Sequence, residues 1–309
     1  MSRLTANLLL LLAGAIWGMG FVAQSTAMDA VGPWTFVATR FFLAALTVLP
    51  FAWREAKSAS KPIDAADWRG FVLVGLMLFL ASVIQQIAIL TTSVTNAGFL
   101  TGLYVVFTPI LALALLRQRP HWVVWPAALT AFAGTVLIGG GSVAALGRGD
   151  LLMIVCAVFW ALQILFLGLF AGRSGRPLTL SCVQFALTSV LACVGMFAFE
   201  TVSLDALFAA WPEIVYGGVF SSGVAFTLQA IGQRHTTAPQ AAIFLSSEAL
   251  FAALFGVAVL GERIAAIGLL GCALIFAAML AVELVPMRLR GREPEPALPD
   301  ESGTAPGKA

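Results

Sequence analysis

Two ionisable residues lie deep inside long apolar stretches of the sequence, and they are the first candidates for chemistry. Glu248 is about eleven residues from either end of Thr237–Leu260, and Arg40 is about seven residues into Pro33–Trp53. An ionisable group at the centre of a bilayer costs at least about 2.5–3.5 kcal/mol, so it normally faces a protein interior or an aqueous cavity. Glu248 could bind a substrate or exchange a proton, and the structural alternative is an acid paired with a neighbouring hydroxyl such as that of Ser246 or Ser247, or an acid held neutral. Arg40 could hold a carboxylate through its planar guanidinium, pair with Glu248, or extend toward the membrane surface.

Amide and aromatic side chains in the apolar segments are further candidates for a substrate site. They are Gln85, Gln229, Gln163, Gln240, Asn96, Tyr104, Trp17 and Trp160. Each amide could equally form a hydrogen bond between helices, and the tryptophans could simply pack. Gln85 and Gln229 are preferred because they occupy equivalent positions of an internal repeat. Amides and aromatic rings suit an uncharged or zwitterionic organic solute better than an inorganic ion, whose path should show several acids.

The residue patterns of an enzyme, a metal site or a nucleotide site are missing from the sequence. His121 and His235 are the only histidines, no HExxH occurs, and Ser221-Ser222 has no GxSxG frame. The stretch Gly139–Ser142 lacks the lysine of a phosphate-binding loop, so we expect no use of ATP. The cysteines show no CxxC spacing, and no basic patch with interleaved aromatics indicates nucleic acid binding. We therefore expect no enzymatic activity, no cofactor, no metal and no nucleic acid partner.

The composition is that of a protein surrounded by lipid. Of the 309 residues, 60% are hydrophobic and 10% are charged, against roughly 25% charged in a soluble domain. About 20 apolar residues cross a hydrocarbon core of about 30 Å. Ten such segments can be read, at Leu4–Gln24, Pro33–Trp53, Trp68–Leu90, Ser93–Leu116, Trp122–Gly140, Asp150–Gly172, Leu178–Glu200, Trp211–Gln233, Thr237–Leu260 and Ile264–Val285. The sequence predicts an all-α integral membrane protein of ten transmembrane helices, with bends at Pro109 and Pro126.

Basic residues fall mostly on one side of the ten segments, which predicts the orientation. With the N-terminus in the cytoplasm, 14 of the 17 Lys and Arg residues lie on the inner side, and only Arg148 and Arg263 lie outside. We expect a plasma or inner membrane protein with both termini cytoplasmic. The longest connections, 54–67 and 201–210, are expected to be loops, and the tail 286–309, rich in Pro, Gly and charge, is expected to be disordered.

The second half of the sequence repeats the first at an offset of 144 residues. Thr35–Phe41 meets Thr179–Phe185, Gln85 meets Gln229, and the first helix follows with Trp17 against Trp160 at an offset of 143. The offset predicts two five-helix repeats over residues 4–140 and 150–285. Because five is an odd number, the second repeat enters the membrane from the opposite side, which makes the repeats inverted. Inverted repeats are typical of secondary transporters that work by alternating access.

Several short motifs follow one another in a characteristic order over residues 8–283. They are Ala15-Ile-Trp-Gly18, Pro33 with Arg40, Asn96-Ala-Gly-Phe-Leu with Thr108-Pro109, Gly149-Asp150-Leu-Leu with Trp160-Ala161, Ala241-Ala-Ile with Glu248, and Leu260-Gly-Glu-Arg263. On these motifs the sequence resembles the drug/metabolite transporter superfamily, of the ten-helix EamA type. Two departures are that Arg117-Gln118-Arg119 lacks the acid of the second-half box, and that Ala249 replaces a proline often seen after the acid.

The resemblance implies transport of small molecules such as amino acids, nucleosides, sugars or drugs. Together with the inverted repeat and Glu248, it leads us to expect a secondary active exporter or exchanger of small organic metabolites with proton coupling. An uncoupled facilitator or channel is the alternative, and an intramembrane enzyme is a more remote one. The expected partners are a small-molecule substrate and the lipid bilayer, and the sequence leaves monomer and homodimer open.

Overall fold

The structure is a computed structural model that describes residues 1–92, 94–138, 147–260 and 266–290. Every regular element in these ranges is helical. Six of the ten predicted segments are long, unbroken helices, namely α1 (Arg3–Ala27), α2 (Pro33–Lys57), α3 (Ala65–Ile89), α7 (Arg148–Ser174), α8 (Pro177–Phe199) and α14 (Ala266–Arg290). A seventh span, Trp211–Gln233, is also long and apolar enough to cross a membrane, and two shorter apolar helices accompany these seven.

Two of the predicted segments are broken near their middle. They consist of α4 (Val94–Thr101) with α5 (Tyr104–Leu116), and of α12 (Ala238–Leu245) with α13 (Ser247–Leu260). At the breaks the backbone forms tight three-residue turns, from Val105 N to Gly102 O and from Ala249 N to Ser246 O. The prediction of two continuous spans was therefore wrong, and the interruption lies at Gly102 rather than at Pro109, which α5 accommodates inside the helix.

The span Trp211–Gln233 changes its helical geometry along its length. It contains α10 (Trp211–Val215), a π-helix η1 (Tyr216–Val224) and α11 (Ala225–Gln233). A π-helix is rare and frequently lies at a functional site. Gly218 brings η1 against α2, because a Cβ there would lie only 2.7 Å from Cβ of Leu43.

The remaining elements differ in detail from the expectation. The predicted loop 201–210 contains a short helix, α9 (Leu204–Ala209). Pro126 lies in the first turn of α6 (Val124–Ile138), where a proline needs no helical hydrogen bond, so no bend results. The helix α14 continues through Pro286 to Arg290, so the first five residues of the predicted disordered tail are helical, and the rest of the tail lies outside the described residues.

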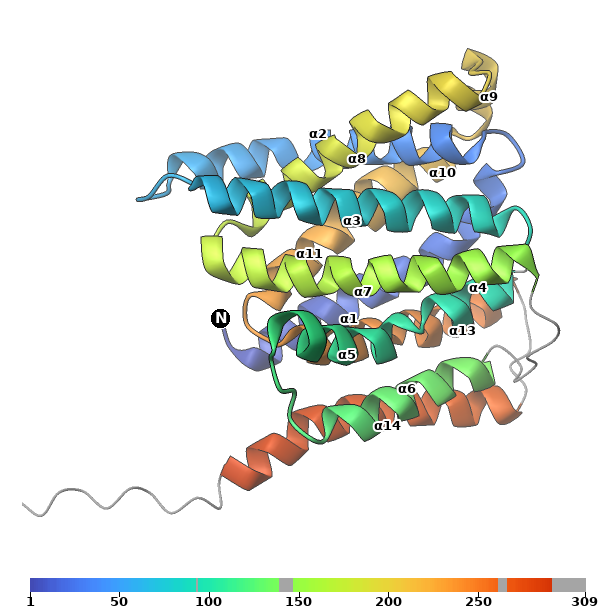
Figure 1. The fold of residues 1–309 in the computed structure, drawn as a ribbon. Helices are drawn as coiled ribbons and strands as arrows, with labels where there is room; N and C mark the ends of the chain where they lie inside the picture. The colour runs from blue at the N-terminus through green and yellow to red at the C-terminus, as the bar shows by residue number, and fades with distance from the viewer. Residues whose placement is uncertain (93, 139–146, 261–265, 291–309) are drawn as a thin grey trace, which may run out of the picture.

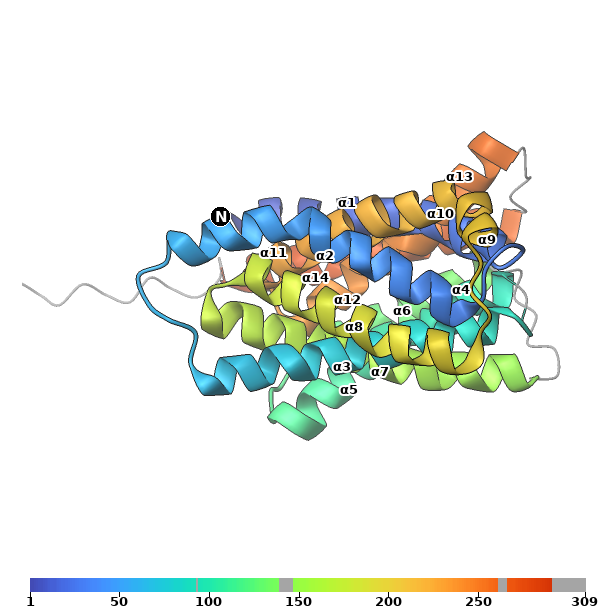
Figure 2. The ribbon, with the colours of Figure 1, turned by 90° about the horizontal axis from the view of Figure 1, so that it is seen from above.

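The helices form one elongated bundle with the α6–α14 pair along one edge and α2 with α8 along the other (Figure 1). The closest neighbours are α2 with α8, α3 with α7, α6 with α14 and α1 with α13, and the view turned by 90° shows the helices running along one common direction (Figure 2). Each of these pairs joins a helix from the first half of the chain to one from the second. The helix α1 begins and α14 ends at the same end of the bundle (Figure 1), which requires an even number of crossings.

Large apolar side chains cover the outside of this bundle. Examples from five helices are Leu12, Phe42, Leu129, Val194 and Phe276, each at least half exposed. An apolar belt of this extent on a folded protein suits contact with lipid rather than water. With the long apolar helices, it identifies a multi-pass membrane protein.

Candidate functional site

A small cavity of about 50 Å³ lies between the two halves of the chain. Seven of the ten residues proposed from the sequence line it, namely Glu248, Arg40, Trp17, Gln85, Gln229, Trp160 and Tyr104. The other lining residues are Phe21, Gln24, Thr101, Ile164, Ser221 and Phe226. The lining therefore combines an aromatic surface with one acid, one base and three amides.

The broken helices place Glu248 and Tyr104 in the cavity. Glu248 lies in the first turn of α13, and Tyr104 is the first residue of α5. The first turn of a helix exposes unpaired N–H groups and the positive end of the helix dipole, both of which favour a carboxylate. The phenol of Tyr104 faces the carboxyl group of Glu248 but does not reach hydrogen-bond geometry with it. The two residues are exactly one repeat offset apart, so the same backbone feature presents an acid in one half and a phenol in the other.

The neighbouring serines do not hold Glu248 in the way that the structural alternative requires. Ser246 Oγ donates to the carbonyl oxygen of Ile243 at 2.7 Å. Ser247 Oγ has no hydrogen-bond partner among the described residues. The carboxyl group is thus buried beside the cavity without a serine partner, which leaves it available to a solute or a proton.

Arg40 is buried, with 3% of its surface exposed, and it does not extend to the membrane surface. Its guanidinium lies 5.3 Å from the ring centre of Phe36 and 4.8 Å from that of Phe41, within the range of cation–π contacts. Its Nε has no hydrogen-bond partner, and no ion pair joins it to Glu248 within the described part of the chain. The cavity therefore contains a cation and an anion that do not neutralise each other directly.

A chain of amides supports one wall of the cavity. Gln229 Nε2 donates to Gln163 Oε1 at 3.2 Å, and Gln163 Nε2 donates to Gln184 Oε1 at 3.2 Å. Gln163 is fully buried behind the wall and is not a lining residue. In the first half, Gln85 Nε2 instead donates to Thr101 Oγ1 at 3.3 Å. Gln163 thus acts on the cavity only through Gln229, whose Oε1 has no partner.

Aromatic rings form the apolar part of the lining. The ring centres of Trp17 and Trp160 lie 4.7 Å and 5.6 Å from that of Phe226, and Trp160 is stacked on it. The indole Nε1 of Trp17 donates to the carbonyl oxygen of Ser221 in η1 at 2.8 Å, which fixes the indole orientation. Phe226 and Ser221 were not predicted as site residues. Phe226 lies one helical turn before Gln229, so the shared helix face was the available signal.

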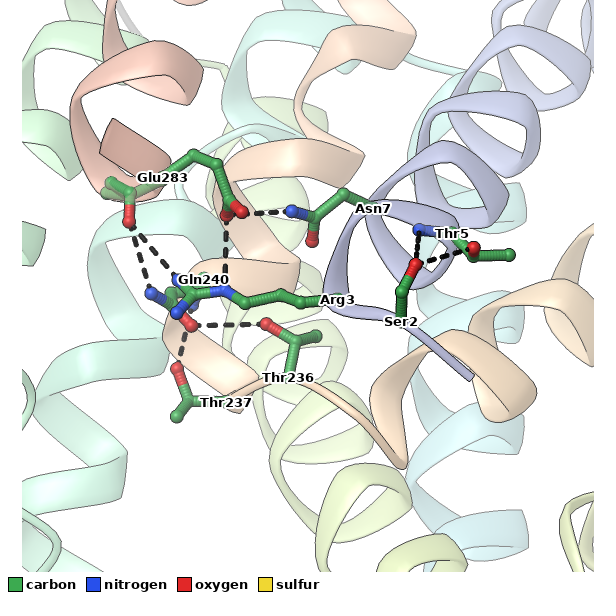
Figure 3. Close-up of polar contacts among 9 residues, drawn as sticks. Ser2, Arg3, Thr5, Asn7, Thr236, Thr237, Gln240 and Glu283 are labelled. Atoms are coloured by element: carbon green, nitrogen blue, oxygen red, sulfur yellow. Dashed lines mark hydrogen bonds and ion pairs between the residues drawn. The ribbon is translucent and has the colours of Figure 1, made fainter. Parts of the chain in front are cut away.

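Besides Gln163, two of the ten proposed residues are not among those that line the cavity, namely Gln240 and Asn96. Gln240 lies near one end of the bundle, where its Nε2 donates to Val282 O at 3.3 Å and its Oε1 accepts from Thr236 Oγ1 at 3.1 Å. Figure 3 shows it beside Arg3 and Asn7, which both contact the carboxylate of Glu283, at 3.2 Å and 2.8 Å. This cluster joins α1, α12 and α14, and Gln240 also lines a second cavity, of about 400 Å³, at this end of the bundle. The side chain of Asn96 lies outside the described residues.

Comparisons with known proteins assign a family and a fold. The sequence profile of the EamA-like transporter family matches residues 4–140 and 147–284. An uncharacterized transporter of Archaeoglobus fulgidus is 32% identical over 91% of this chain and 87% of its own length. The uncharacterized transporter YwfM of Bacillus subtilis is 24% identical over 93% of this chain and 96% of its own length. A solved crystal structure with 21% identity superposes with a TM-score of 0.77 over 93% of this chain and 99% of that one, which shows the same fold.

Proposed function

Because the chain belongs to the EamA-like transporter family, we propose that it is a secondary transporter of small organic metabolites, such as amino acids or drug-like solutes. It would export these solutes or exchange them across a plasma or inner membrane. The relatives named above are uncharacterized transporters, so the solute class is argued from the cavity.

The proposed mechanism is alternating access between two inverted repeats of five helices. Three observations support it. The profile matches the chain twice in tandem, the closest helix pairs each join one helix of either half, and the first and last helices meet at one end of the bundle (Figure 1). That end also contains Arg3 and the basic connection between α2 and α3 (Figure 1), as expected for the cytoplasmic side. Both termini would then be cytoplasmic, and ten segments would cross the bilayer.

The observation that carries the proposal is the cavity itself. It lies between the two halves of the chain, where transporters built from internal repeats bind their solutes. Arg40 and Glu248 approach it from different halves without an ion pair between them, and desolvated charges in such a place attract complementary groups strongly. A solute with a carboxylate, a cationic group and an apolar body would satisfy Arg40, Glu248 and the tryptophans together.

Glu248 is also the residue proposed to couple transport to protons. It is the only acid among the described lining residues. A buried carboxyl group can be neutralised by a proton or by a cationic group of the solute, and the two would compete for it. Such competition couples the movement of one to that of the other.

The test is solute flux in liposomes that contain the purified protein. A panel of radiolabelled metabolites is measured with and without an imposed pH gradient, together with counterflow against unlabelled solute. We expect saturable flux of at least one zwitterionic solute, counterflow, and acceleration by the gradient. Flux that never saturates would identify a channel or facilitator, and saturable flux that is indifferent to the gradient would remove the proton coupling.

A further inference from the structure

The N-terminus of α2 is held by a carboxylate from the end of α8. Glu200 directly follows α8, and its two oxygens accept from Trp34 N at 2.9 Å and Thr35 N at 2.8 Å. Thr35 Oγ1 donates a third bond at 2.7 Å. The approach depends on Gly32, because a Cβ at that position would lie 2.3 Å from the Glu200 carboxyl carbon. The first N–H groups of a helix have no partner within the helix, so Glu200 completes the start of α2.

The same arrangement occurs at the opposite end of the same two helices, with their roles exchanged. Glu55, near the end of α2, accepts from Leu178 N at 3.1 Å and Thr179 N at 2.7 Å at the start of α8. Thr179 Oγ1 donates at 2.6 Å. Thr179 follows Thr35 by 144 residues, the offset of the repeat. Each helix of this antiparallel pair therefore caps the other, and the two carboxylate clamps lie at opposite ends of the bundle.

Close packing joins the two helices between the clamps. Ser189 Oγ donates to Ala38 O at 2.9 Å, and the rings of Phe41 and Phe185 lie 5.9 Å apart. The ring of Trp34 lies directly on Gly195, where an added Cβ would come within 2.0 Å of it. The contact is continuous from one clamp to the other.

The contact between α1 and α13 is of a different kind. It is formed by Gly14 and Gly18 against Ser247 and the backbone at Phe251 and Ala252, and Ser247 Oγ has no hydrogen-bond partner there. Small residues allow close packing but contribute no charge-assisted hydrogen bonds, whereas a carboxylate with three donors must lose such bonds before its helix can move away.

We propose that α2 and α8 move as one rigid pair throughout the transport cycle, kept together at both ends by Glu55 and Glu200, and that the cavity opens by movement along α1 and α13. The part of this inference that concerns the transport cycle rests on the proposed function. The rigidity of the α2–α8 pair can be measured without any flux assay. It assigns Glu55 and Glu200 as positioning residues, far from the substrate.

The first experiment measures the rigidity by spin-label distances. In a background with Cys156, Cys182, Cys193 and Cys272 replaced by alanine, labels at Phe42→Cys in α2 and Phe197→Cys near the end of α8, both exposed positions, report the distance between the two helices on their Glu200 side. We expect one narrow distance distribution, which broadens when Glu200→Ala is added. The matched control is Glu213→Ala, because Glu213 accepts a single bond, from Thr26 Oγ1 at 3.3 Å. A distribution that Glu200→Ala leaves as narrow as the control does would overturn the clamp.

The second experiment measures flux after crosslinking in a background with Cys156, Cys193 and Cys272 replaced by alanine. Ala45→Cys can be linked to the native Cys182, whose Sγ lies 3.9 Å from Ala45 O, by a short bifunctional reagent that forms a reducible disulfide with each thiol. We expect this link to leave most of the flux intact. The comparison variant, Gly14→Cys with Ser247→Cys, should lose its flux when oxidised and regain it when reduced.

Each outcome of the crosslinking has a distinct meaning. Loss of flux after linking α2 to α8, with recovery on cleavage by a reductant, would overturn the rigid pair. Retained flux after linking α1 to α13 would overturn the proposed place of movement. If no variant shows flux even before crosslinking, the proposed function fails, and the spin-label distances still decide the clamp.

Discussion

The two halves of the chain present different chemistry at equivalent positions. In the first half Arg40 lies in the cavity, and its equivalent 144 residues later is the neutral Gln184, which belongs to the buried amide chain. In the second half Glu248 lies in the cavity, and its equivalent is the neutral Tyr104. Each half thus supplies one charge, at a different position of a common scaffold.

The difference shows that the scaffold and the site follow separate requirements. A broken helix, a capped helix start and a close helix pair can each occur twice, because they depend on backbone geometry. Two equivalent charges of one sign would meet across the cavity and repel each other. One cation and one anion at inequivalent positions instead create a polar axis, which can orient an asymmetric solute.

The largest effect on flux is expected when Glu248, the acidic residue of the cavity, is replaced by a neutral one. Glu248→Gln should lower flux driven by a pH gradient by roughly 10- to 100-fold, since such coupling energies are typically 1–3 kcal/mol. Tyr104→Phe, at the equivalent position, removes a hydroxyl without a hydrogen-bond partner and should lower flux by less than about threefold. Both are measured in liposomes at matched protein content. Equal losses in the two variants would show that the acid has no special role.

The next largest effect is expected at Arg40, the basic residue of the cavity. Arg40→Gln makes the first half resemble the second at this position, and it should weaken the apparent affinity for solutes with a carboxylate by roughly 10- to 100-fold, because hydrogen bonds to charged groups contribute about 1.5–3 kcal/mol. Methyl esters of the same solutes should lose little. Counterflow at varied solute concentration measures both. Arg54→Gln, an exposed residue at the end of α2, is the control, and a loss of the same size there would contradict a role in the cavity.

A smaller effect is expected when the hydrogen-bond partners of the two equivalent amides, Gln229 and Gln85, are removed. Gln163→Leu removes both hydrogen bonds of the chain behind Gln229 and should raise KM by about fivefold, as one lost hydrogen bond costs about 1 kcal/mol. Thr101→Val removes the single partner of Gln85 and should raise it less. Initial rates across a range of solute concentrations provide KM. Gln240 lies away from this cavity, so Gln240→Leu should change the stability of the protein but leave KM unaltered.

The smallest effect is expected at the connection between α2 and α3, where Arg173 forms ion pairs with Asp64 and Asp67. A hydrogen bond from the backbone N–H of Asp67 holds the pKa of Asp64 below its usual value, and Arg173 at 3.2 Å lowers it further. Because its pKa is lowered in the folded protein, the Asp64 carboxylate stabilises the fold at pH values above its pKa in the unfolded chain, which is about 4. This stabilisation is lost as the pH falls through the lower pKa of the folded protein. Asp64→Asn should therefore lower Tm slightly at pH 7 and leave it unchanged in acid. A difference that persists in acid would have another cause, and Arg173→Gln tests the contribution of the partner.

Much of the fold could be predicted because membrane helices are apolar over a defined length. The helices α1, α2, α3, α7 and α8 begin and end within a few residues of the predicted segments. The breaks before Tyr104 and Ser247 could not be predicted, because Gly102 and Ser246 are small residues that also occur inside continuous helices. The short helix α9 was missed because six residues show too little periodicity.

The candidate site was partly predictable for the same physical reason. Charged and amide groups are costly in lipid, so Arg40, Glu248, Gln85 and Gln229 were selected by type and depth alone, and all four line the cavity. That argument selects any buried polar residue, so it also selected Gln240 and Gln163, which serve helix contacts. It could not select Phe226, because an apolar ring in an apolar segment carries no distinguishing signal.

The sequence alone determined the membrane class, the family resemblance and the residues that lipid would not tolerate, because these depend on composition and on the order of residues along the chain. Tertiary structure alone decided which of those residues share a cavity, that Arg40 and Glu248 do not pair there, and that Glu55 and Glu200 cap each other's helices. The reason is geometric. A side chain's type fixes what it must avoid, whereas its partner depends on helix rotation and on the approach of segments more than a hundred residues apart.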